Sequence, residues 1–469
     1  MKSMKRTFRN ALVSIRLFSD RLPAAGFVIS LLGSLIAISG QAANLSISRK
    51  MEFTVGSPQT WPQVTNSSVH GVIALRDGGS LVYGENFDSS AVYSVPWKIG
   101  LTRFNPEGVV AWVREYAESN VSVSISSDCI EEASGALLIL CRRTTRPDLS
   151  NTWTPFLLRL DSSGNVIENS SIGAGYSELI KYEDGYLIGG SHTGMNPYYF
   201  QFQKLGTNLA QQWQTNFSAA ADSLICCLVT TPGGYMYGIR SGPYRVVKMA
   251  TNNDLVWDAK FPTTSGGGAD DLKQIIPTSD GGCLLCGTSS TDTGFNKSDA
   301  HYGEYDCWLL KVSATGTKQW DRSFGGTGSD FFGFLYQRAD GGYLLGCHTQ
   351  TFGANGNKGV AGTGLWVLSL DATLNKDAEH LLAPDYNYSW NSTAGVMLGG
   401  FPNSSTNFET RIIDPSLRAV ISIQNPDGTP YAVDTSTNLN GWNPMIFGAT
   451  ADIQISERMA LPMKFYRVR

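Results

Sequence analysis

The stretch LKQIIPTSDGGCLLCGTSS at residues 272–290, followed by YDCWLLKVSATGTKQWDRSFGG at residues 305–326, decides the fold of this chain. It contains an apolar strand, a turn built on Asp-Gly-Gly, a second apolar strand, a long loop, and two further strands joined by a polar turn. Glycine accepts the positive φ that such a hairpin turn requires. The stretch therefore predicts one four-stranded antiparallel unit.

The same unit recurs along the chain, and a recurring unit of this size indicates a repeat architecture. The next copy is FFGFLYQRADGGYLLGCHTQ (331–350) with LWVLSLDATLNKDAEHL (365–381), and five weaker copies complete the set. A spacing of roughly 50 to 60 residues suits one propeller blade. We therefore predict an all-β fold, a seven-bladed β-propeller, with six or eight blades as the alternatives. The first turns of the seven copies fall near Asp77, Ser134, Asp184, Pro232, Asp280, Asp340 and Thr393.

Two features of the copies indicate how the blades pack. Strands such as Leu344-Leu345 are apolar at consecutive positions, which indicates burial on both faces. One place in the repeat is taken by tryptophan, and a stripe of equivalent tryptophans is typical of packing between blades rather than of a ligand platform. These residues are Trp112, Trp213, Trp257 and Trp320.

The last copy is incomplete, and this predicts how the ring closes. NYSWNSTAGVMLGG (387–400) leads only to FETRIID (408–414) and lacks a fourth strand. ISRKMEFTV (47–55) precedes the first copy and matches the fourth-strand position. We expect this N-terminal strand to pair beside residues 408–413, because closure removes two exposed sheet edges. The expected domains are a propeller at 43–416 and a small C-terminal β domain at 417–469.

The N-terminus reads as a signal peptide covering residues 1–42. A basic region between Lys2 and Arg21 precedes an uncharged apolar run at 24–39, and Gly40-Gln41-Ala42 places small residues before the expected cleavage after Ala42. An uncleaved anchor is the alternative, but the apolar run is shorter than the roughly 20 residues that span a bilayer. We expect export to the periplasm, cell surface or extracellular space, with no transmembrane span in the mature chain.

The repeats and the tail resemble known exported proteins. The runs SDGGCLLCGTSS (279–290) and YDCWLLKVSATGTKQWDRSFGGTGSDFF (305–332) resemble the DGGYLLAG-type blade repeats of exported bacterial β-propeller repeat proteins. The tail, YAVDTSTNLNGWNPM (431–445) with LPMKFYRVR (461–469), is similar to a short C-terminal β domain with an STNL–W pattern and a terminal FYR. The resemblance implies export and a propeller. It implies no reaction, and a propeller fold alone warrants no function.

Acidic residues recur just before the first strand of several blades, where the chain reaches the mouth of the propeller's channel. A ring of carboxylates there would bind a cation such as Ca²⁺ through oxygen ligands. The alternative, which we favour, is that each side chain caps its own loop or faces water. No other cofactor is expected. The acidic residues are Asp222, Asp270, Asp271 and Asp330.

The longest loops, 286–305 and 347–363, join the second and third strands of their blades on the same face as these acidic connections. Functional residues concentrate on loops that a rigid scaffold holds. No catalytic residues are predicted, because no Ser-His-Asp order, phosphate loop or paired catalytic carboxylates stand out. The candidate ligand-binding residues of this face are Arg240, Asp292, His301, Tyr302, Tyr305 and His348.

Eight cysteines in a chain expected to be exported allow disulfide bonds. Cys129 and Cys141 flank one hairpin turn almost symmetrically, and Cys286 and Cys307 lie on strands expected to be adjacent. Both pairs are candidates, and small buried side chains are the alternative reading for all eight.

Two hypotheses for function remain. The favoured one is a non-enzymatic exported propeller that binds a glycan, a peptide or a surface partner through its loop face. The alternative is a polysaccharide hydrolase or lyase with its site at the channel mouth. The small net charge of −4 and the lack of a polybasic face after residue 50 argue against a nucleic-acid partner.

Overall fold

The structure is a computed structural model of the whole chain. Side chains are described within residues 69–382. The described residues are 27–31, 34–38, 46–55, 59–61, 68–86, 97–106, 109–145, 153–173, 175–192, 198–219, 223–240, 242–264, 270–338, 340–382, 388–392, 395–400, 408–424, 431–436, 443–449, 453–458 and 464–468.

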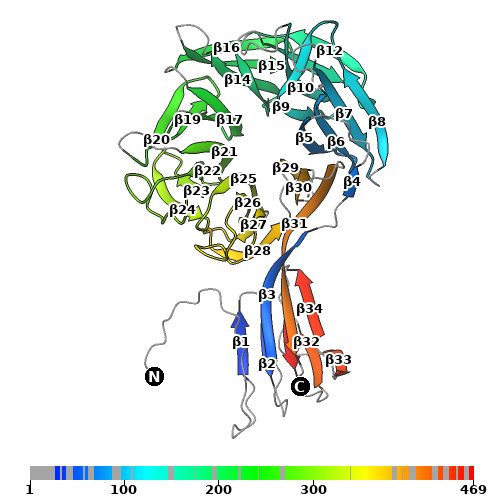
Figure 1. Cartoon of the computed structure of the whole chain (residues 1–469), viewed down its shortest axis with the longest axis vertical. Helices are drawn as coiled ribbons and strands as arrows, with labels where there is room; N and C mark the ends of the chain where they lie inside the picture. The colour runs from blue at the N-terminus through cyan, green and yellow to red at the C-terminus, as the bar shows by residue number, and fades with distance from the viewer. Residues whose placement is uncertain are drawn as a thin grey trace. The chain divides into compact units, whose positions relative to one another are not determined.

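Six four-stranded antiparallel sheets follow one another along the chain and surround a common centre, so the fold is a β-propeller (Figure 1). We call these sheets blades one to six. Blade one consists of β5 (Ser68–Ala74), β6 (Ser80–Asn86), β7 (Lys98–Phe104) and β8 (Val110–Tyr116). Blade two consists of β9 (Ser122–Glu131), β10 (Leu137–Thr144), β11 (Thr154–Leu160) and β12 (Val166–Ser171). Blade three consists of β13 (Tyr176–Tyr182), β14 (Gly185–His192), β15 (Tyr199–Gly206) and β16 (Gln211–Ser218).

Blades four to six have the same order of strands from the centre outward. Blade four consists of β17 (Leu224–Thr231), β18 (Gly234–Arg240), β19 (Tyr244–Ala250) and β20 (Leu255–Phe261). Blade five consists of β21 (Asp271–Pro277), β22 (Cys283–Ser289), β23 (Asp306–Val312) and β24 (Lys318–Phe324). Blade six consists of β25 (Asp330–Gln337), β26 (Tyr343–Thr349), β27 (Gly364–Leu370) and β28 (Lys376–Leu382).

The Asp-Gly-Gly turns form the hairpins between the first and second strands, as the sequence predicts. In blade five, Gly281 has a φ of +80°, and the Asp280 carboxylate accepts a 3.0 Å hydrogen bond from the Gly282 N–H. The aspartate thus closes the turn on its own backbone while glycine supplies the left-handed conformation. The turns at Asp77 and Asp340 make the equivalent 3.0 Å bonds.

A β-bulge interrupts the pairing of the first and second strands in each of these six blades. A bulge inserts an extra residue, bends the strand and disturbs the alternation of its side chains. In blades four and five the extra residues are Cys226 and Lys273. This irregularity therefore changes which side chains the innermost strands present.

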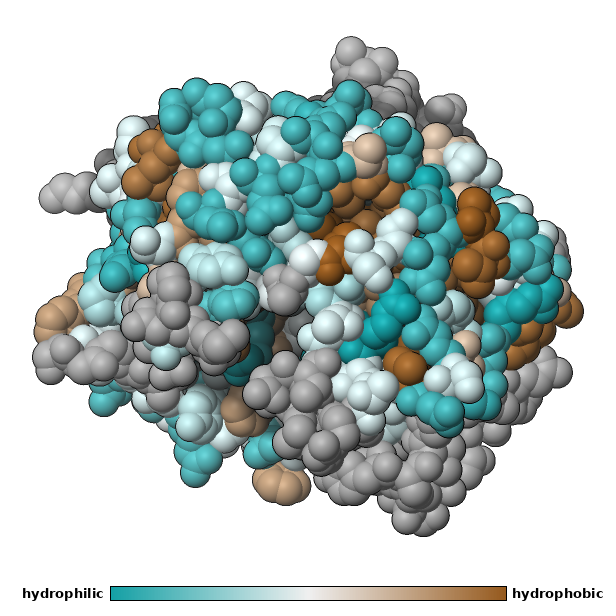
Figure 2. Space-filling view, turned by 90° about the horizontal axis from the view of Figure 1, so that it is seen from above, coloured by the Kyte–Doolittle hydropathy of each residue, from teal (hydrophilic) through white to brown (hydrophobic). Residues whose placement is uncertain are grey.

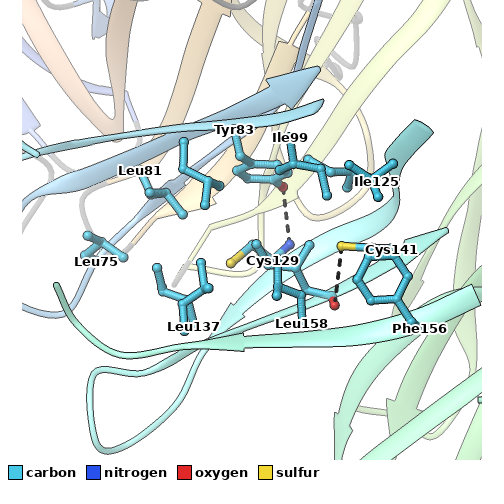
Figure 3. Close-up of a cluster of buried hydrophobic side chains, with 14 residues drawn as sticks. Leu75, Leu81, Tyr83, Ile99, Ile125, Cys129, Leu137, Cys141, Phe156 and Leu158 are labelled. Atoms are coloured by element: carbon cyan, nitrogen blue, oxygen red, sulfur yellow. Dashed lines mark hydrogen bonds between the residues drawn. The ribbon is translucent and has the colours of Figure 1, made fainter. Parts of the chain in front are cut away.

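The core of the propeller lies between the blades. All residues of β22 and β23 are buried, which confirms the prediction of burial on both faces. Figure 3 shows the cluster between blades one and two, where the Tyr83 hydroxyl accepts a 3.3 Å hydrogen bond from the Cys129 N–H. The four equivalent tryptophans are partly buried and pack against such clusters, which confirms that they are packing residues.

The outer strands are more polar than the inner ones. In β16, exposed and half-buried residues alternate along the second half of the strand. In the view of Figure 2 the surface is mainly hydrophilic, with separate hydrophobic patches. The blades therefore bury their hydrophobic residues against one another and present polar outer edges.

A further group of strands follows blade six and includes a piece of the N-terminal region. Its sheet order is β29 (Tyr388–Ser392), β30 (Gly395–Gly400), β31 (Phe408–Gln424) and β3 (Ser46–Val55), and β4 (Gln59–Trp61) also pairs with β31. The residues in register with 408–410 are 59–61, so the prediction that 47–55 would pair at this point is corrected. The predicted segment lies in β3, which does pair with β31 in the same sheet. The 17 residues of β31 leave room for several partners along its length.

The chain forms two compact units, Val55–Asp414 and a second unit of Met1–Thr54 with Pro415–Arg469. The predicted bounds, a propeller at 43–416 and a C-terminal β domain at 417–469, stay predictions. The second unit contains the five-stranded sheet β1 (Phe27–Leu31), β2 (Ser34–Ile38), β35 (Lys464–Val468), β32 (Tyr431–Ser436) and β33 (Asn443–Ala449), and β34 (Ile453–Arg458), which pairs with β31. β1 and β2 fall within the predicted signal peptide. Within the described residues, no helix is long and apolar enough to cross a membrane.

Candidate functional site on the loops of blades five and six

The loop that joins β22 to β23, residues 290–305, is held from inside by Lys297; we call it the blade-five loop. Lys297 is 1% exposed, and its ammonium donates a 2.7 Å hydrogen bond to the carbonyl oxygen of Thr291. Burial lowers the pKa of Lys297, and the carboxylates of Asp306 and Asp270 oppose that effect. The lysine thus acts as an internal clamp on the loop backbone.

The loop that joins β26 to β27, residues 350–363, has the same device; we call it the blade-six loop. Lys358 is 2% exposed and donates 2.7 Å hydrogen bonds to the carbonyl oxygens of Thr351 and Gly362. Burial lowers the pKa of this lysine as well. Each lysine directly follows an asparagine, so Asn296-Lys297 and Asn357-Lys358 form a short repeated motif.

A carboxylate on the outermost strand of blade five anchors the same loop from the other side. Asp321 accepts hydrogen bonds from the Ser298 N–H at 2.9 Å and the Trp308 indole N–H at 3.0 Å, and it pairs with Lys318 at 2.6 Å. Although burial alone would raise the pKa of Asp321, the hydrogen bonds from Lys318, Ser298 and Trp308 outweigh it and lower that pKa. The blade-five loop is thereby tied to two strands of its own blade.

Glu379 plays the same part in blade six. It accepts hydrogen bonds from the Gly359 N–H at 3.0 Å and the Trp366 indole N–H at 2.9 Å, and it pairs with Lys376 at 2.7 Å. Sequence reasoning missed this arrangement. Its signal is an Asn-Lys pair, then a tryptophan, then Lys-x-x-Asp or Lys-x-x-Glu, repeated in two consecutive copies.

The acidic residues predicted as calcium ligands are engaged in different ways. Asp270 is 6% exposed and accepts a 2.6 Å hydrogen bond from the Thr263 hydroxyl, and burial raises its pKa. Asp271 forms ion pairs with Lys273 at 2.7 Å and with Arg240 at 2.9 Å. Asp222 lies outside the described residues.

Asp330 is fully buried and serves the connection between blades five and six. Its carboxylate accepts hydrogen bonds from the Gly326 N–H at 2.8 Å and the Thr351 hydroxyl at 2.9 Å. Asp306, also fully buried, accepts a 2.7 Å bond from the Tyr302 N–H. Across the part of the chain that the structure describes, no group of three or more His, Cys, Asp or Glu side chains is arranged to hold a metal ion. The calcium hypothesis stays a prediction.

The predicted ligand-binding residues form pairs rather than one cluster. His301 Nδ1 lies 3.3 Å from Asp292 Oδ1 within the blade-five loop. The ring of Tyr305 lies 5.3 Å from that of Phe331, measured between ring centroids. The three remaining candidates are placed differently. The Tyr302 N–H donates to the Asp306 carboxylate, Arg240 ends β18 beside Asp271, and His348 lies on β26, where burial lowers its pKa.

Exposed phenylalanines are the feature of this face that sequence reasoning missed. Phe295 of the blade-five loop is 73% exposed, and Phe352 of the blade-six loop is 82% exposed. Phe331, at the start of β25, is 36% exposed. An aromatic residue within a loop rich in Gly, Asn and Thr is a signal that the sequence carries, because such a loop offers little to bury the ring.

The innermost strands enclose a cavity of about 630 Å³ along the centre of the propeller. Its lining includes Ile73 of β5, Cys129 of β9, Glu178 of β13, Cys226 of β17, Lys273 of β21 and Phe332 of β25. Within this lining, Glu178 and Lys273 are the charged residues. It therefore holds no pair of carboxylates of the kind that glycoside hydrolysis uses.

All eight cysteines carry free thiols in the structure. Cys129 is in register with Ile139, and Cys141 with Ile125, so the two cysteines are not directly opposite each other. Cys286 is in register with Leu309 on the adjacent strand that carries Cys307. Disulfide formation by either predicted pair stays a prediction.

No protein-family profile and no curated protein sequence matches the chain. Among solved structures, BamB from Moraxella catarrhalis is similar at 13% identity and a TM-score of 0.41, over 77% of this chain and 98% of BamB. Sqt1 from Chaetomium thermophilum is similar at 8% identity and a TM-score of 0.43, over 80% of this chain and 85% of Sqt1.

Raptor from Chaetomium thermophilum is similar at 7% identity and a TM-score of 0.47, over 76% of this chain and 29% of Raptor. Likenesses this distant carry no argument about ligands or partners.

Proposed function

We propose that this chain is an exported, non-enzymatic β-propeller that binds a glycan through its blade-five and blade-six loops. The observation that carries the proposal is the exposure of Phe295 and Phe352 on two loops whose backbones are clamped by Lys297 and Lys358. Loops that are already ordered lose little conformational entropy when a ligand binds. Exposed rings on such loops are therefore available for recognition.

A glycan fits these loops better than a peptide or a charged polymer does. A sugar ring presents an apolar C–H face that stacks on an aromatic ring, and its hydroxyl groups form hydrogen bonds at its edge. The blade-five loop that carries Phe295 also carries polar groups, namely Asp292 and His301, whose side chains lie 3.3 Å apart. The net charge of −4 becomes −9 once residues 1–42, with six Lys/Arg and one Asp, are removed, and this charge opposes the binding of a polyanion.

A glycan array probed with the mature protein tests the proposal. A hit should be measured by calorimetry against Phe295→Ala and Phe352→Ala, each expected to weaken binding about tenfold, which corresponds to roughly 1.4 kcal/mol. Ile167→Ala is the matched control, because Ile167 is 57% exposed on β12, in blade two. Equal effects of the control and the loop variants, or the absence of any glycan hit, would overturn the proposal.

The same array distinguishes the enzymatic alternative. If mass spectrometry of a bound oligosaccharide shows shortened products after incubation, the chain is a hydrolase or lyase. An unchanged oligosaccharide supports a binding protein. If peptides bind and glycans do not, the partner class in the proposal is wrong.

We also propose that the propeller has seven blades, the last formed by β29, β30, the first part of β31 and β4. Support comes from β29, which contacts both β5 of blade one and β25 of blade six. Thr60 is in register with Glu409. The double variant Thr60→Cys/Glu409→Cys should form a disulfide under mild oxidation, because directly opposed strand residues suit its geometry. Thr60→Cys/Ile412→Cys should not, and crosslinking of that control pair instead would refute this closure.

Export and the organisation of the chain ends belong to the same proposal. We infer cleavage after Ala42 and a small C-terminal β domain at 417–469. The basic and apolar N-terminal regions support the cleavage, which removes β1 and β2 from the edge of their sheet, and the pairing of β35, β32 and β33 with one another supports the domain. N-terminal sequencing of the protein recovered outside the cytoplasm tests the cleavage site. A chain that retains residues 1–42 would contradict it.

A further inference from the structure

Two adjacent cysteines meet at the β-bulge of blade four. In a regular strand, successive side chains point to opposite faces. Here Ile225 is in register with Ile239 and Cys227 with Gly238, which leaves Cys226 as the extra residue. The bulge brings the two Sγ atoms to 3.7 Å from each other.

The opposite strand leaves room for both thiols. An ideal Cβ at Gly238 would lie 2.6 Å from the Cys227 Sγ and 3.2 Å from the Cys226 Sγ. Any larger residue at this position would displace the sulfurs. The glycine therefore maintains the space in which the two thiols lie against each other.

Both thiols line the central cavity, and Cys226 is the more exposed of the two. Cys226 is the one cysteine of the eight that is not buried, and it lines the 630 Å³ cavity. Cys227 is buried, and its hydrogen bond with Cys226, together with burial, raises its pKa. A reagent in the cavity therefore meets Cys226 first.

We propose that Cys226 and Cys227 form a reversible dithiol–disulfide site that exchanges with small disulfides of the glutathione class. The Cys226 thiolate attacks one sulfur of glutathione disulfide, forming a mixed disulfide and releasing one glutathione thiolate. Cys227 loses its proton and attacks the Cys226 sulfur, which releases the second glutathione. The protein dithiol is oxidised by two electrons, and the glutathione disulfide is reduced to two glutathione thiols.

The geometry makes this site a switch rather than a permanent crosslink. Consecutive Cα atoms across a trans peptide are about 3.8 Å apart. Most disulfides join Cα atoms that are roughly 4.4–6.8 Å apart, and a bond outside that range is strained and easily reduced. The bond between Cys226 and Cys227 should therefore open readily in the presence of excess thiol.

Mass spectrometry of the folded protein after treatment with glutathione disulfide tests the proposal. The wild-type chain should lose two thiols and the mass of two hydrogen atoms, and it should retain no glutathione. Peptide mapping should place the new bond between Cys226 and Cys227, and excess reduced glutathione should restore both thiols.

Three variants make each step visible. Cys227→Ser should retain one glutathione on Cys226, because no second thiol can release it. Cys226→Ser should react more slowly than the wild type, because Cys227 is buried. Cys283→Ser, a fully buried cysteine on β22, is the control and should react like the wild type. Circular dichroism confirms that each variant is folded.

Several results would overturn the proposal. One is a wild-type chain that keeps a stable glutathione adduct on Cys226, because Cys227 then does not resolve it. Another is a folded wild-type chain that does not react although iodoacetamide alkylates Cys226. A third is a Cys226→Ser variant that oxidises as fast as the wild type. None of these results depends on whether the loops bind a glycan.

Discussion

Replacing Asp321 by asparagine should destabilise the propeller by about 3 kcal/mol. The Asp321 side chain is 0% exposed, and that of Lys318 is 19% exposed. Asparagine keeps an oxygen that can accept the N–H groups of Ser298 and Trp308, so the main loss is the ion pair. Breaking a buried pair from one side costs roughly 3–5 kcal/mol. The low end applies because Lys318 still donates to the Ser298 hydroxyl.

Urea unfolding followed by tryptophan fluorescence measures this loss. Over the unit Val55–Asp414, an entropy of about 2.1 cal/mol/K per residue converts 3 kcal/mol into a decrease in melting temperature of about 4 °C. Hydrogen exchange should show the largest increase in the blade-five loop, residues 290–305, because Asp321 anchors that segment.

A double-mutant cycle separates the ion pair from other effects. Lys318→Met removes the cation, and the double variant Asp321→Asn/Lys318→Met should be more stable than the sum of the single losses predicts, by at least about 1 kcal/mol. A loss below about 1 kcal/mol for Asp321→Asn, or additive single effects, would refute the role of this pair. So would an exchange increase spread evenly over all blades.

Three further predictions concern other parts of the propeller. Gly287→Ala should lower the free energy of unfolding by more than about 3 kcal/mol, because the new Cβ would lie 2.0 Å from a backbone oxygen of β21. Chemical denaturation measures this loss, and Gly294→Ala is the control, because the nearest atom to its Cβ would be 3.7 Å away. Trp366→Phe should lower the free energy of unfolding by about 2 kcal/mol in the same assay, because it removes the 2.9 Å hydrogen bond from the indole N–H to Glu379. An unchanged denaturation midpoint would contradict this. Burial raises the pKa of Asp377 from 3.8 to about 6, so the folded state binds its proton more tightly than the unfolded chain does. The contribution of Asp377 to stability should therefore fall by about 1 kcal/mol as pH rises from 3.8 to about 6, after allowance for the partial exposure of the group. Asp377→Asn should reduce the pH dependence of the melting temperature over this range by that amount, and an unchanged dependence would contradict this.

Local chemistry explains why the blades could be predicted. The Asp280 carboxylate closes the turn on the Gly282 N–H, and Gly281 supplies the positive φ, so three consecutive residues specify the hairpin. The runs of apolar residues in β22 and β23 directly reported burial on both faces. These signals depend on neighbours in the sequence, and their recurrence revealed the propeller.

The candidate site was only partly predictable. The loops themselves were found because their length interrupts the repeat. Their internal clamps were missed, because Lys297 and Lys358 resemble ordinary surface lysines until the carbonyl oxygens around them are seen. The exposed rings of Phe295 and Phe352 were missed for the related reason that exposure depends on which residues the rest of the loop leaves uncovered.

The sequence by itself determined the repeated strand-turn-strand unit, because backbone preferences of Asp-Gly-Gly and the spacing of apolar residues act over a few positions. Only the tertiary structure decided how residues far apart in the chain meet. It placed residues 59–61, rather than 47–55, in register with 408–410, and it turned Cys226 toward Cys227 through a bulge. Strand register and bulges depend on the sum of many weak cross-strand contacts, and no short segment of sequence encodes that sum.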